Sequence, residues 1–146
     1  MRHAVASTPC PCGRTLSVHP LTWADCCGRY LDAPSFAQSL PAPDAESLMR
    51  SRYSAFVRGD TAYLRATWHV STCPQEVLAD AATRWLGLTV RAHRVIDADH
   101  AEVEFIARYR AGGAGPASGR AVRLHERSRF VRESDRWYYV DGDALQ

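Results

Sequence analysis

The feature that most constrains this chain is a pair of cysteine doublets close to its start. Cys10 and Cys12 flank one proline, and after 13 further residues Cys26 and Cys27 follow each other directly. Zinc is held tetrahedrally by soft thiolates, and four of them close a structural site. The free energy of metal capture can order a segment that is too small to have its own core. The spacing therefore predicts a zinc knuckle built from these four cysteines.

Two alternatives to zinc are redox chemistry at these thiols and cysteines without a shared role. A disulfide between the adjacent Cys26 and Cys27 would be strained, and one across the loop is disfavoured in a reducing compartment. His19 is an alternative ligand, but it lies in the middle of the loop between the doublets. Cys73 is isolated in the sequence, and we interpret it as a plain core or surface thiol.

The hydrophobic period predicts helices after the first 43 residues. Asp44 is a good helix N-cap and Gly59 a good C-terminal stop for a helix over 45–58, and Asp60 can cap a second short helix. Residues 77–83 are expected to form a third helical piece. We therefore divide the chain into a knuckle (1–31), a connector (32–43) and an α+β domain (44–146). The core of this domain is expected to be separate from the knuckle.

After Arg84 the period changes to two, which is typical of strands. One apolar row contains Leu86, Leu88 and Val90, and a second runs from Val103 to Tyr109. A glycine-rich turn at 112–119 precedes strands over 122–131 and 136–140. Helices followed by adjacent strands indicate an α+β fold in which the helices pack on one face of an antiparallel sheet.

The composition excludes several classes of protein. The net charge is only +2, with all 18 basic residues being arginine, so strong nucleic-acid binding is not expected. No stretch approaches the roughly 18 to 20 apolar residues that a membrane span needs. Residues 1–8 lack the apolar centre of a signal peptide. We therefore expect a cytoplasmic protein with reduced thiols.

Two sequence resemblances extend this interpretation. CPCG at 10–13 and CCG at 26–28 resemble the SEC-C motif, the small zinc knuckle at the C-terminus of the SecA translocase ATPase. The chain departs from that motif because Gly-Arg-Thr-Leu at 13–16 replaces the usual Gly-Ser-Gly-Lys and because the intervening loop is longer. The missing lysine weakens any transfer of the partners that basic SEC-C knuckles bind.

The remaining chain resembles the YchJ family. The resemblance rests on LMRSRYSAFVRGDTAYLRATWH at 48–69, WLGLTV at 85–90, EFIARYR at 104–110 and HERSRFVRESDRWYYVDG at 125–142. It implies a nuclear transport factor 2-like (NTF2-like) α+β domain behind a SEC-C knuckle. In such a domain a curved antiparallel sheet wraps around helices as a cone, often with a pocket inside. The resemblance supplies a fold and a metal rather than a reaction.

Strand parity places polar groups on the inner face of this expected cone. Glu126 and Ser128 alternate on the same row as Leu124 and Phe130. A buried carboxylate must be paired or protonated, and the candidate partners of Glu126 are Arg50, Arg52 and His69. Glu126 is then a structural ion-pair partner, a pocket carboxylate or a catalytic acid or base. The opposite row, from His125 to Val131, should form a basic stripe on the outer face.

We place the candidate ligand pocket on seven residues, namely Arg52, Tyr53, Trp68, His69, Trp85, Glu126 and Ser128. Packing in the core is the alternative role of Trp68, Trp85 and Trp137. We assign no catalytic residue, because no nucleophile triad, phosphate-binding loop or hydrolase motif is present.

Three functions remain open from the sequence. The leading one is a non-enzymatic protein with a structural zinc that binds an unknown protein or small-molecule ligand. The second is a small isomerase- or dehydratase-like enzyme, with Glu126 and His69 as acid and base. The third is contact with RNA or the ribosome through arginines 108, 110, 120, 123, 127 and 129, which the near-neutral charge disfavours.

Overall fold

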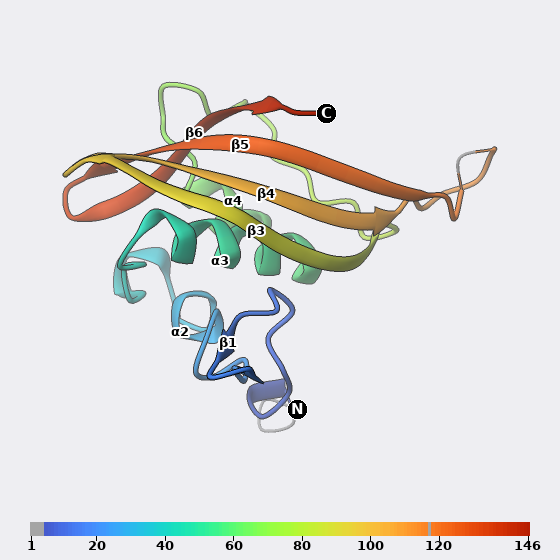
Figure 1. Cartoon of the computed structure of the whole chain (residues 1–146), viewed down its shortest axis with the longest axis horizontal. Helices are drawn as coiled ribbons and strands as arrows, with labels where there is room; N and C mark the ends of the chain where they lie inside the picture. The colour runs from blue at the N-terminus through green and yellow to red at the C-terminus, as the bar shows by residue number, and fades with distance from the viewer. Residues whose placement is uncertain (1–4, 117) are drawn as a thin grey trace.

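The computed structural model describes residues 5–116 and 118–146, so residues 1–4 of the opening segment lie outside the described residues. The chain forms three layers, with the knuckle below helix α3 and a four-stranded sheet above it (Figure 1). The expected α+β fold is therefore confirmed. The elements are β1 (Thr15–Leu16), β2 (His19–Pro20), α2 (Gly28–Leu31), the short 3-10 helix η1 (Phe36–Gln38), α3 (Ala45–Arg58), α4 (Thr61–Ala66), β3 (Arg84–Asp97), β4 (His100–Arg110), β5 (Ala121–Glu133) and β6 (Arg136–Ala144).

Helices α3 and α4 begin and end where the capping residues predict. The Asp44 carboxylate accepts a hydrogen bond of 2.7 Å from the backbone N–H of Ser47. Gly59 ends α3 in the left-handed region, with φ of 70°. The Asp60 carboxylate then accepts from the backbone N–H of Tyr63 at 3.0 Å and opens α4. Each cap satisfies a backbone group that the helix itself leaves free.

The expected third helical piece over 77–83 is wrong. These residues form an irregular segment between α4 and β3. The Asp80 carboxylate accepts from the backbone N–H of Ala82 at 2.9 Å, and its carbonyl accepts from that of Thr83 at 3.1 Å. A side chain that binds its own local backbone offers the chain an alternative to helical hydrogen bonds, so a tight turn replaces the helix.

The four long strands form an antiparallel meander in the order β3-β4-β5-β6. The expected apolar row on β3 is partly wrong, because the register shifts between Trp85 and Gly87. An inserted residue turns the following side chains to the other face of the sheet. Leu88 and Val90 therefore pack on the core together with Trp85, whereas Leu86 is 47% exposed.

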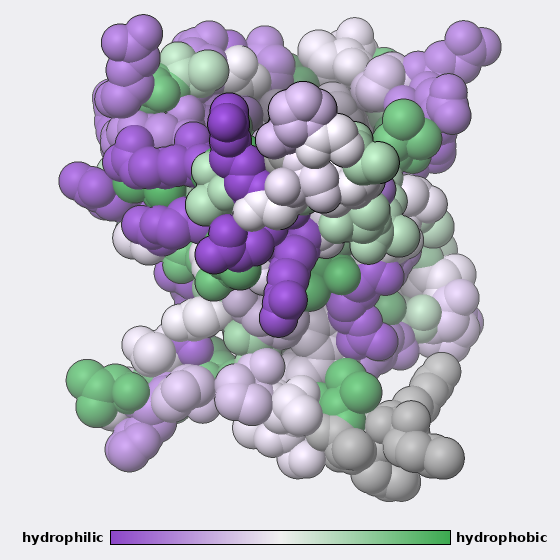
Figure 2. Space-filling model, turned by 90° about the vertical axis from the view of Figure 1, so that its right-hand side faces the viewer, coloured by the Kyte–Doolittle hydropathy of each residue, from purple (hydrophilic) through white to green (hydrophobic). Residues whose placement is uncertain are grey.

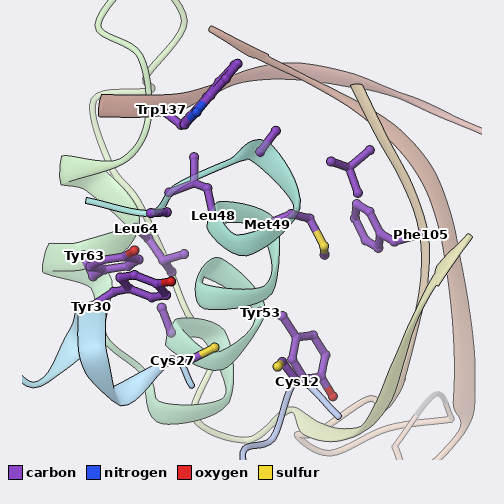
Figure 3. Close-up of a cluster of buried hydrophobic side chains, with 14 of the residues drawn as sticks. Cys12, Cys27, Tyr30, Leu48, Met49, Tyr53, Tyr63, Leu64, Phe105 and Trp137 are labelled. Carbon is purple, nitrogen blue, oxygen red and sulfur yellow. The ribbon is translucent and has the colours of Figure 1, made fainter. Parts of the chain in front are cut away.

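The knuckle and the α+β domain share one hydrophobic core, which corrects the expectation of two separate cores. Buried residues of the knuckle belong to the same cluster as the side chains of α3, α4 and the sheet, and they comprise Cys10, Cys12, Trp23, Cys26, Cys27 and Tyr30. Figure 3 shows Cys12 beside Tyr53, and Tyr30 beside Tyr63, around the α3 helix. Helix α3 is thus packed on two opposite sides.

Polar contacts reinforce this junction. The Arg50 side chain donates to the backbone oxygen of Cys12 at 3.0 Å and to the Glu46 carboxylate at 2.9 Å. Arg14, from the knuckle, donates to the hydroxyl of Ser47 at 2.8 Å. Two arginines, one from each part, therefore tie the knuckle to the first turns of α3.

The outer face of the sheet carries charges of both signs. Arg129 binds Asp141 at 2.6 Å and Asp143 at 2.7 Å, and His125 binds Glu104 at 2.8 Å. In Figure 2, hydrophilic residues gather in the upper part of the visible face, at the level of the sheet. Carboxylates interrupt the expected basic stripe.

Among the described residues, no helix has the length and apolar character that crossing a membrane requires.

Candidate metal centre and ligand pocket

The knuckle brings the four predicted cysteine ligands to one point. Their sulfur atoms all lie within 4.8 Å of one another, and all four residues are buried. Cys10 and Cys12 lie in a turn before the β1–β2 hairpin, and Cys26 and Cys27 lie at the start of α2. The hairpin returns the chain from the first doublet to the second. Two doublets that are distant in sequence therefore form one compact sulfur cluster.

The cluster has the dimensions of a tetrahedral thiolate site. With metal–sulfur bonds of about 2.3 Å, the edges of a tetrahedron measure about 3.8 Å. The sulfur atoms of Cys12 and Cys26 lie 3.6 Å apart. His19 is exposed on β2 and is not part of the cluster, and Cys73 lies elsewhere with its thiol near the carbonyl of Pro74. The four cysteines fit a metal ion without further ligands.

The pKa values of the four cysteine thiols also favour the binding of a metal cation. Hydrogen bonding, first from Cys12, lowers the pKa of Cys10 far below its usual range. Hydrogen bonding, first with Cys10, raises the pKa of Cys27 far above its usual range. The first thiolate is thus stabilised by the other thiols, whereas ionisation of Cys26 and Cys27 is opposed. Four adjacent thiolates require a positive ion between them, and this requirement couples metal binding to proton release.

Trp23 is buried inside the knuckle, and no role was predicted for it from the sequence. It is 1% exposed, and its indole N–H donates to Asp32 at 2.6 Å. The Arg58 guanidinium of α3 lies 4.4 Å from the centre of its ring. A Cβ atom on Gly28 would lie 2.5 Å from the carbonyl oxygen of Trp23, so only glycine fits there. A large aromatic residue between the two cysteine doublets was the feature of the sequence that could have predicted this buried position.

A cavity of about 380 Å³ lies between α3 and the inner face of the sheet. Six of the seven residues that the sequence placed in a pocket line it, namely Arg52, Tyr53, Trp68, Trp85, Glu126 and Ser128. Most other lining side chains are apolar and come from α3, β4 and β5. The irregular segment that contains Leu78 and Asp80 contributes to the lining as well. The cavity has the size and the mixed chemistry of small-molecule sites.

Arg52 is the most unusual residue of this lining, because it is only 7% exposed. Its Nη1 donates to the carbonyl of Leu64 at 2.8 Å and to the hydroxyl of Thr67 at 2.7 Å. The guanidinium carbon lies 4.7 Å from the ring centre of Tyr139 and 5.2 Å from that of Trp68. Burial lowers the pKa of Arg52 to about 10, which still leaves it charged near neutrality.

Glu126 faces the same cavity but does not bind Arg52 directly. The Ser128 hydroxyl donates to its Oε2 at 2.6 Å. Among the described residues, no ion pair within 4.0 Å involves Glu126, so the expected direct pairing with Arg50 or Arg52 is wrong. A Cβ atom on Gly142 would lie 2.5 Å from Oε2, and this glycine therefore leaves room for the carboxylate. The structure places Glu126 in the pocket lining.

His69 lies outside the cavity lining and away from Glu126. Its Nε2 forms a hydrogen bond with the Glu133 carboxylate, and its Nδ1 is 2.6 Å from the hydroxyl of Ser71. Its backbone N–H donates to the carbonyl of Tyr139 at 2.7 Å, which fixes the segment after α4 against β6. The histidine is thus engaged in holding this segment, and the structure does not bring the supposed acid–base pair together.

Sequence reasoning missed several pocket residues that a consistent use of strand parity would have found. Phe105, Ala107 and Tyr109 follow the inward row of β4, and all three line the cavity. Tyr139 also lines it from β6. A register shift between Arg129 and Phe130 sets the facing of β6, and a period of two does not reveal such a shift.

These features define a class of protein, in which a four-cysteine metal knuckle packs on a cone-shaped α+β domain with an interior pocket. Residues 44–142 match the model of one family, described as YchJ, middle NTF2-like domain. Because this match spans more than half of the chain, the protein belongs to the YchJ family.

Relatives and solved structures agree with this assignment. A UPF0225 protein of Polaromonas naphthalenivorans is 58% identical over 146 residues, which covers 95% of this chain and 99% of the relative. The crystal structure of a SEC-C motif containing protein from Psychrobacter arcticus is similar with a TM-score of 0.75 and 30% identity, over 98% of this chain and 86% of that one. The solution structure of a SEC-C motif containing protein from Rhodopseudomonas palustris is similar with a TM-score of 0.71 and 31% identity, over 95% and 100%.

Proposed function

We propose that this chain is a cytoplasmic small-ligand-binding module whose fold is fastened by one structural zinc ion. The observation that carries the proposal is the cavity of about 380 Å³, which is mostly apolar and contains a few buried polar groups. A well-formed apolar cavity with convergent polar groups is the usual form of a small-molecule site. A cytoplasmic location is supported by the cluster of four cysteines, because thiols stay available to a metal only where they remain reduced.

Zinc is the metal that the donor set favours. Four cysteine thiolates with tetrahedral spacing are typical of structural zinc sites. When bound, zinc would supply cross-linking of the two doublets, and the four sulfur ligands would leave no position for a substrate. The zinc would therefore stabilise the knuckle, which shares its core with α3, without taking part in a reaction.

The enzymatic alternative, an isomerase- or dehydratase-like reaction, finds less support in the geometry. Its proposed acid and base were Glu126 and His69. Glu126 lines the cavity, whereas His69 binds Glu133 outside it. General acid–base catalysis needs both groups within hydrogen-bond reach of one substrate. Contact with nucleic acid is also less supported, because the near-neutral net charge disfavours it and because one of the six candidate arginines, Arg129, is already paired with Asp141 and Asp143.

Binding of a neutral apolar dye, Nile Red, tests whether the cavity accepts ligands. In the Ala107→Phe variant a large side chain fills the cavity from β4, where Ala107 is buried and lines it. In the matched control, Arg108→Phe, the same side chain is placed on the next residue of the strand, which is exposed and outside the lining. We expect the dye affinity to fall about tenfold or more only in Ala107→Phe. Equal dye binding by all three proteins would refute the proposal.

A further inference from the structure

Two opposite charges in the cavity lining do not neutralise each other by contact, and the third charged side chain, Asp80, accepts a hydrogen bond from the backbone N–H of Ala82. Arg52 from α3 and Glu126 from β5 both line the cavity. Among the described residues, no carboxylate lies within 4.0 Å of the Arg52 guanidinium. The rest of the lining is dominated by apolar side chains. A ligand that fits this cavity therefore needs a polar end with two different functions and an apolar body.

The Arg52 end of the cavity has more hydrogen-bond donors than acceptors. The guanidinium has five N–H groups, and its hydrogen bonds to described residues use Nη1 alone. The two nearby aromatic rings, of Trp68 and Tyr139, contribute negative faces but no carboxylate. The indole N–H of Trp68 is buried, with no acceptor among the described residues. This surplus of donors around a buried cation is suited to a carboxylate.

The Glu126 end of the cavity has the opposite character. Ser128 donates to Oε2, and the hydrogen bonds described for Glu126 leave Oε1 without a donor. The carboxylate thus presents a hydrogen-bond acceptor to the cavity. This end is suited to a group that donates hydrogen bonds and carries a positive charge.

We propose, building on the ligand-binding function above, that the cavity binds a free α-amino acid with a large apolar side chain. The α-carboxylate accepts hydrogen bonds from Arg52, and the α-ammonium donates to Glu126. The apolar side chain then packs against lining residues that include Met49, Phe56, Phe105, Ala107 and Leu124. The charges of Arg52 and Glu126 and both charges of the ligand are neutralised in one arrangement.

Simpler polar ends match only one side of the pocket. A plain carboxylate pairs with Arg52 but places a second negative charge beside Glu126. A plain amine pairs with Glu126 but leaves the buried Arg52 cation without a counter-charge. An amide in place of the carboxylate can accept a hydrogen bond from Arg52 but leaves the charge of this buried cation without a counter-charge.

Calorimetric titration with related probes tests this inference in the full chain. The probes are L-tryptophan, indole-3-propionate, which lacks the amine, tryptamine, which lacks the carboxylate, and L-tryptophanamide. L-phenylalanine and L-leucine vary the apolar body. We expect L-tryptophan, L-phenylalanine or L-leucine to bind. For an indole ligand, loss of either charged group should weaken binding about tenfold or more, because each removes a charged hydrogen bond.

Two variants separate the contributions of the two charges. Glu126→Gln keeps the shape of the side chain and should abolish the preference for L-tryptophan over indole-3-propionate. Arg52→Lys keeps the charge without the fork and should weaken every carboxylate probe. Arg136→Gln is the control, because Arg136 is also partly buried and binds backbone carbonyls, but it lies outside this cavity. It should leave the affinities of all probes unchanged.

The outcomes distinguish this inference from the proposed function. If indole-3-propionate or the amide binds as tightly as L-tryptophan, the two-charge recognition is overturned. If no amino acid binds but Nile Red still distinguishes Ala107→Phe from Arg108→Phe, the ligand class is wrong and the binding function stands. If the dye does not distinguish them, the binding function fails as well.

Discussion

Replacing Tyr30 by alanine tests whether the knuckle and the α+β domain unfold as one unit. Tyr30 belongs to the knuckle helix α2 and is 2% exposed. Figure 3 shows it beside Tyr63 of α4, on the side of α3 away from the sheet. Its ring is therefore buried by the domain rather than by the knuckle alone. Tyr30→Ala should create a cavity at the junction between the two parts.

The expected magnitude follows from this burial. Truncation of a buried aromatic side chain to alanine costs about 3 to 5 kcal/mol of the free energy of unfolding. A chain of 146 residues has an unfolding entropy of about 0.3 kcal/mol/K, at about 2.1 cal/mol/K for each residue. The unfolding temperature should therefore fall by about 10 to 16 °C. Leu16→Ala, at a knuckle residue that is 68% exposed, is the control and should change stability by less than about 0.5 kcal/mol.

The assay follows the two parts separately in one sample of the cobalt-substituted protein. Cobalt–thiolate absorption reports on the knuckle, and far-ultraviolet circular dichroism reports on the helices and sheet of the domain. If the core is continuous, both signals change at the same temperature, and Tyr30→Ala lowers both equally. The reasoning is refuted if Tyr30→Ala lowers only the cobalt transition while that of the sheet stays in place.

Three further predictions follow from individual contacts. Purified protein should contain about one zinc per chain by metal analysis, with an affinity that falls as the pH falls, because the thiolates must be deprotonated; Cys12→Ser should weaken the site, whereas Cys73→Ser should not. Asp44→Ala removes the N-cap bond to Ser47 and should cost about 1 kcal/mol in chemical denaturation, whereas Asp25→Ala, at an exposed residue outside the caps of the described helices, should cost less. A hydrogen bond from His125 lowers the pKa of Glu104. This pair therefore stabilises the fold above the usual pKa of a glutamate and loses its effect as the pH falls through the lowered value. In His125→Ala, carbon-13 NMR should find the pKa of Glu104 raised, and an unchanged pKa would contradict the pairing.

Much of the fold was predictable because its signals are local. The caps Asp44 and Asp60 act within three residues, so the sequence alone locates the starts of α3 and α4. Strand parity likewise put Glu126 and Ser128 on the inner face. One error arose where sheet pairing overrides a simple period, at the register shift after Trp85, and another where a local hydrogen bond from the Ala82 backbone to Asp80 replaces a helix by a turn.

The candidate site was harder to predict because it depends on distances between separate elements. The sequence could place Arg52 and Glu126 on inward faces, but not their separation across the cavity. The sequence therefore offered Arg52 as one candidate partner of Glu126, whereas Arg52 binds the backbone of Leu64 and the hydroxyl of Thr67. His69 failed for a related reason, since its partner Glu133 is 64 residues away in the chain.

The sequence of α3 does indicate the shared core, and it also indicates how the metal centre and the ligand pocket are connected. Ser51 and Ser54 are completely buried, although serine has little apolar surface to gain from burial. The Ser54 hydroxyl lies 3.6 Å from the sulfur of Cys10. One residue earlier, Tyr53 lines the cavity and lies beside Cys12 in Figure 3. Small residues on a helix let a neighbouring segment approach closely, so they mark a second packed side. Arg52 therefore belongs to a turn of α3 that contacts the cysteine cluster through Ser54 and lines the cavity through Tyr53.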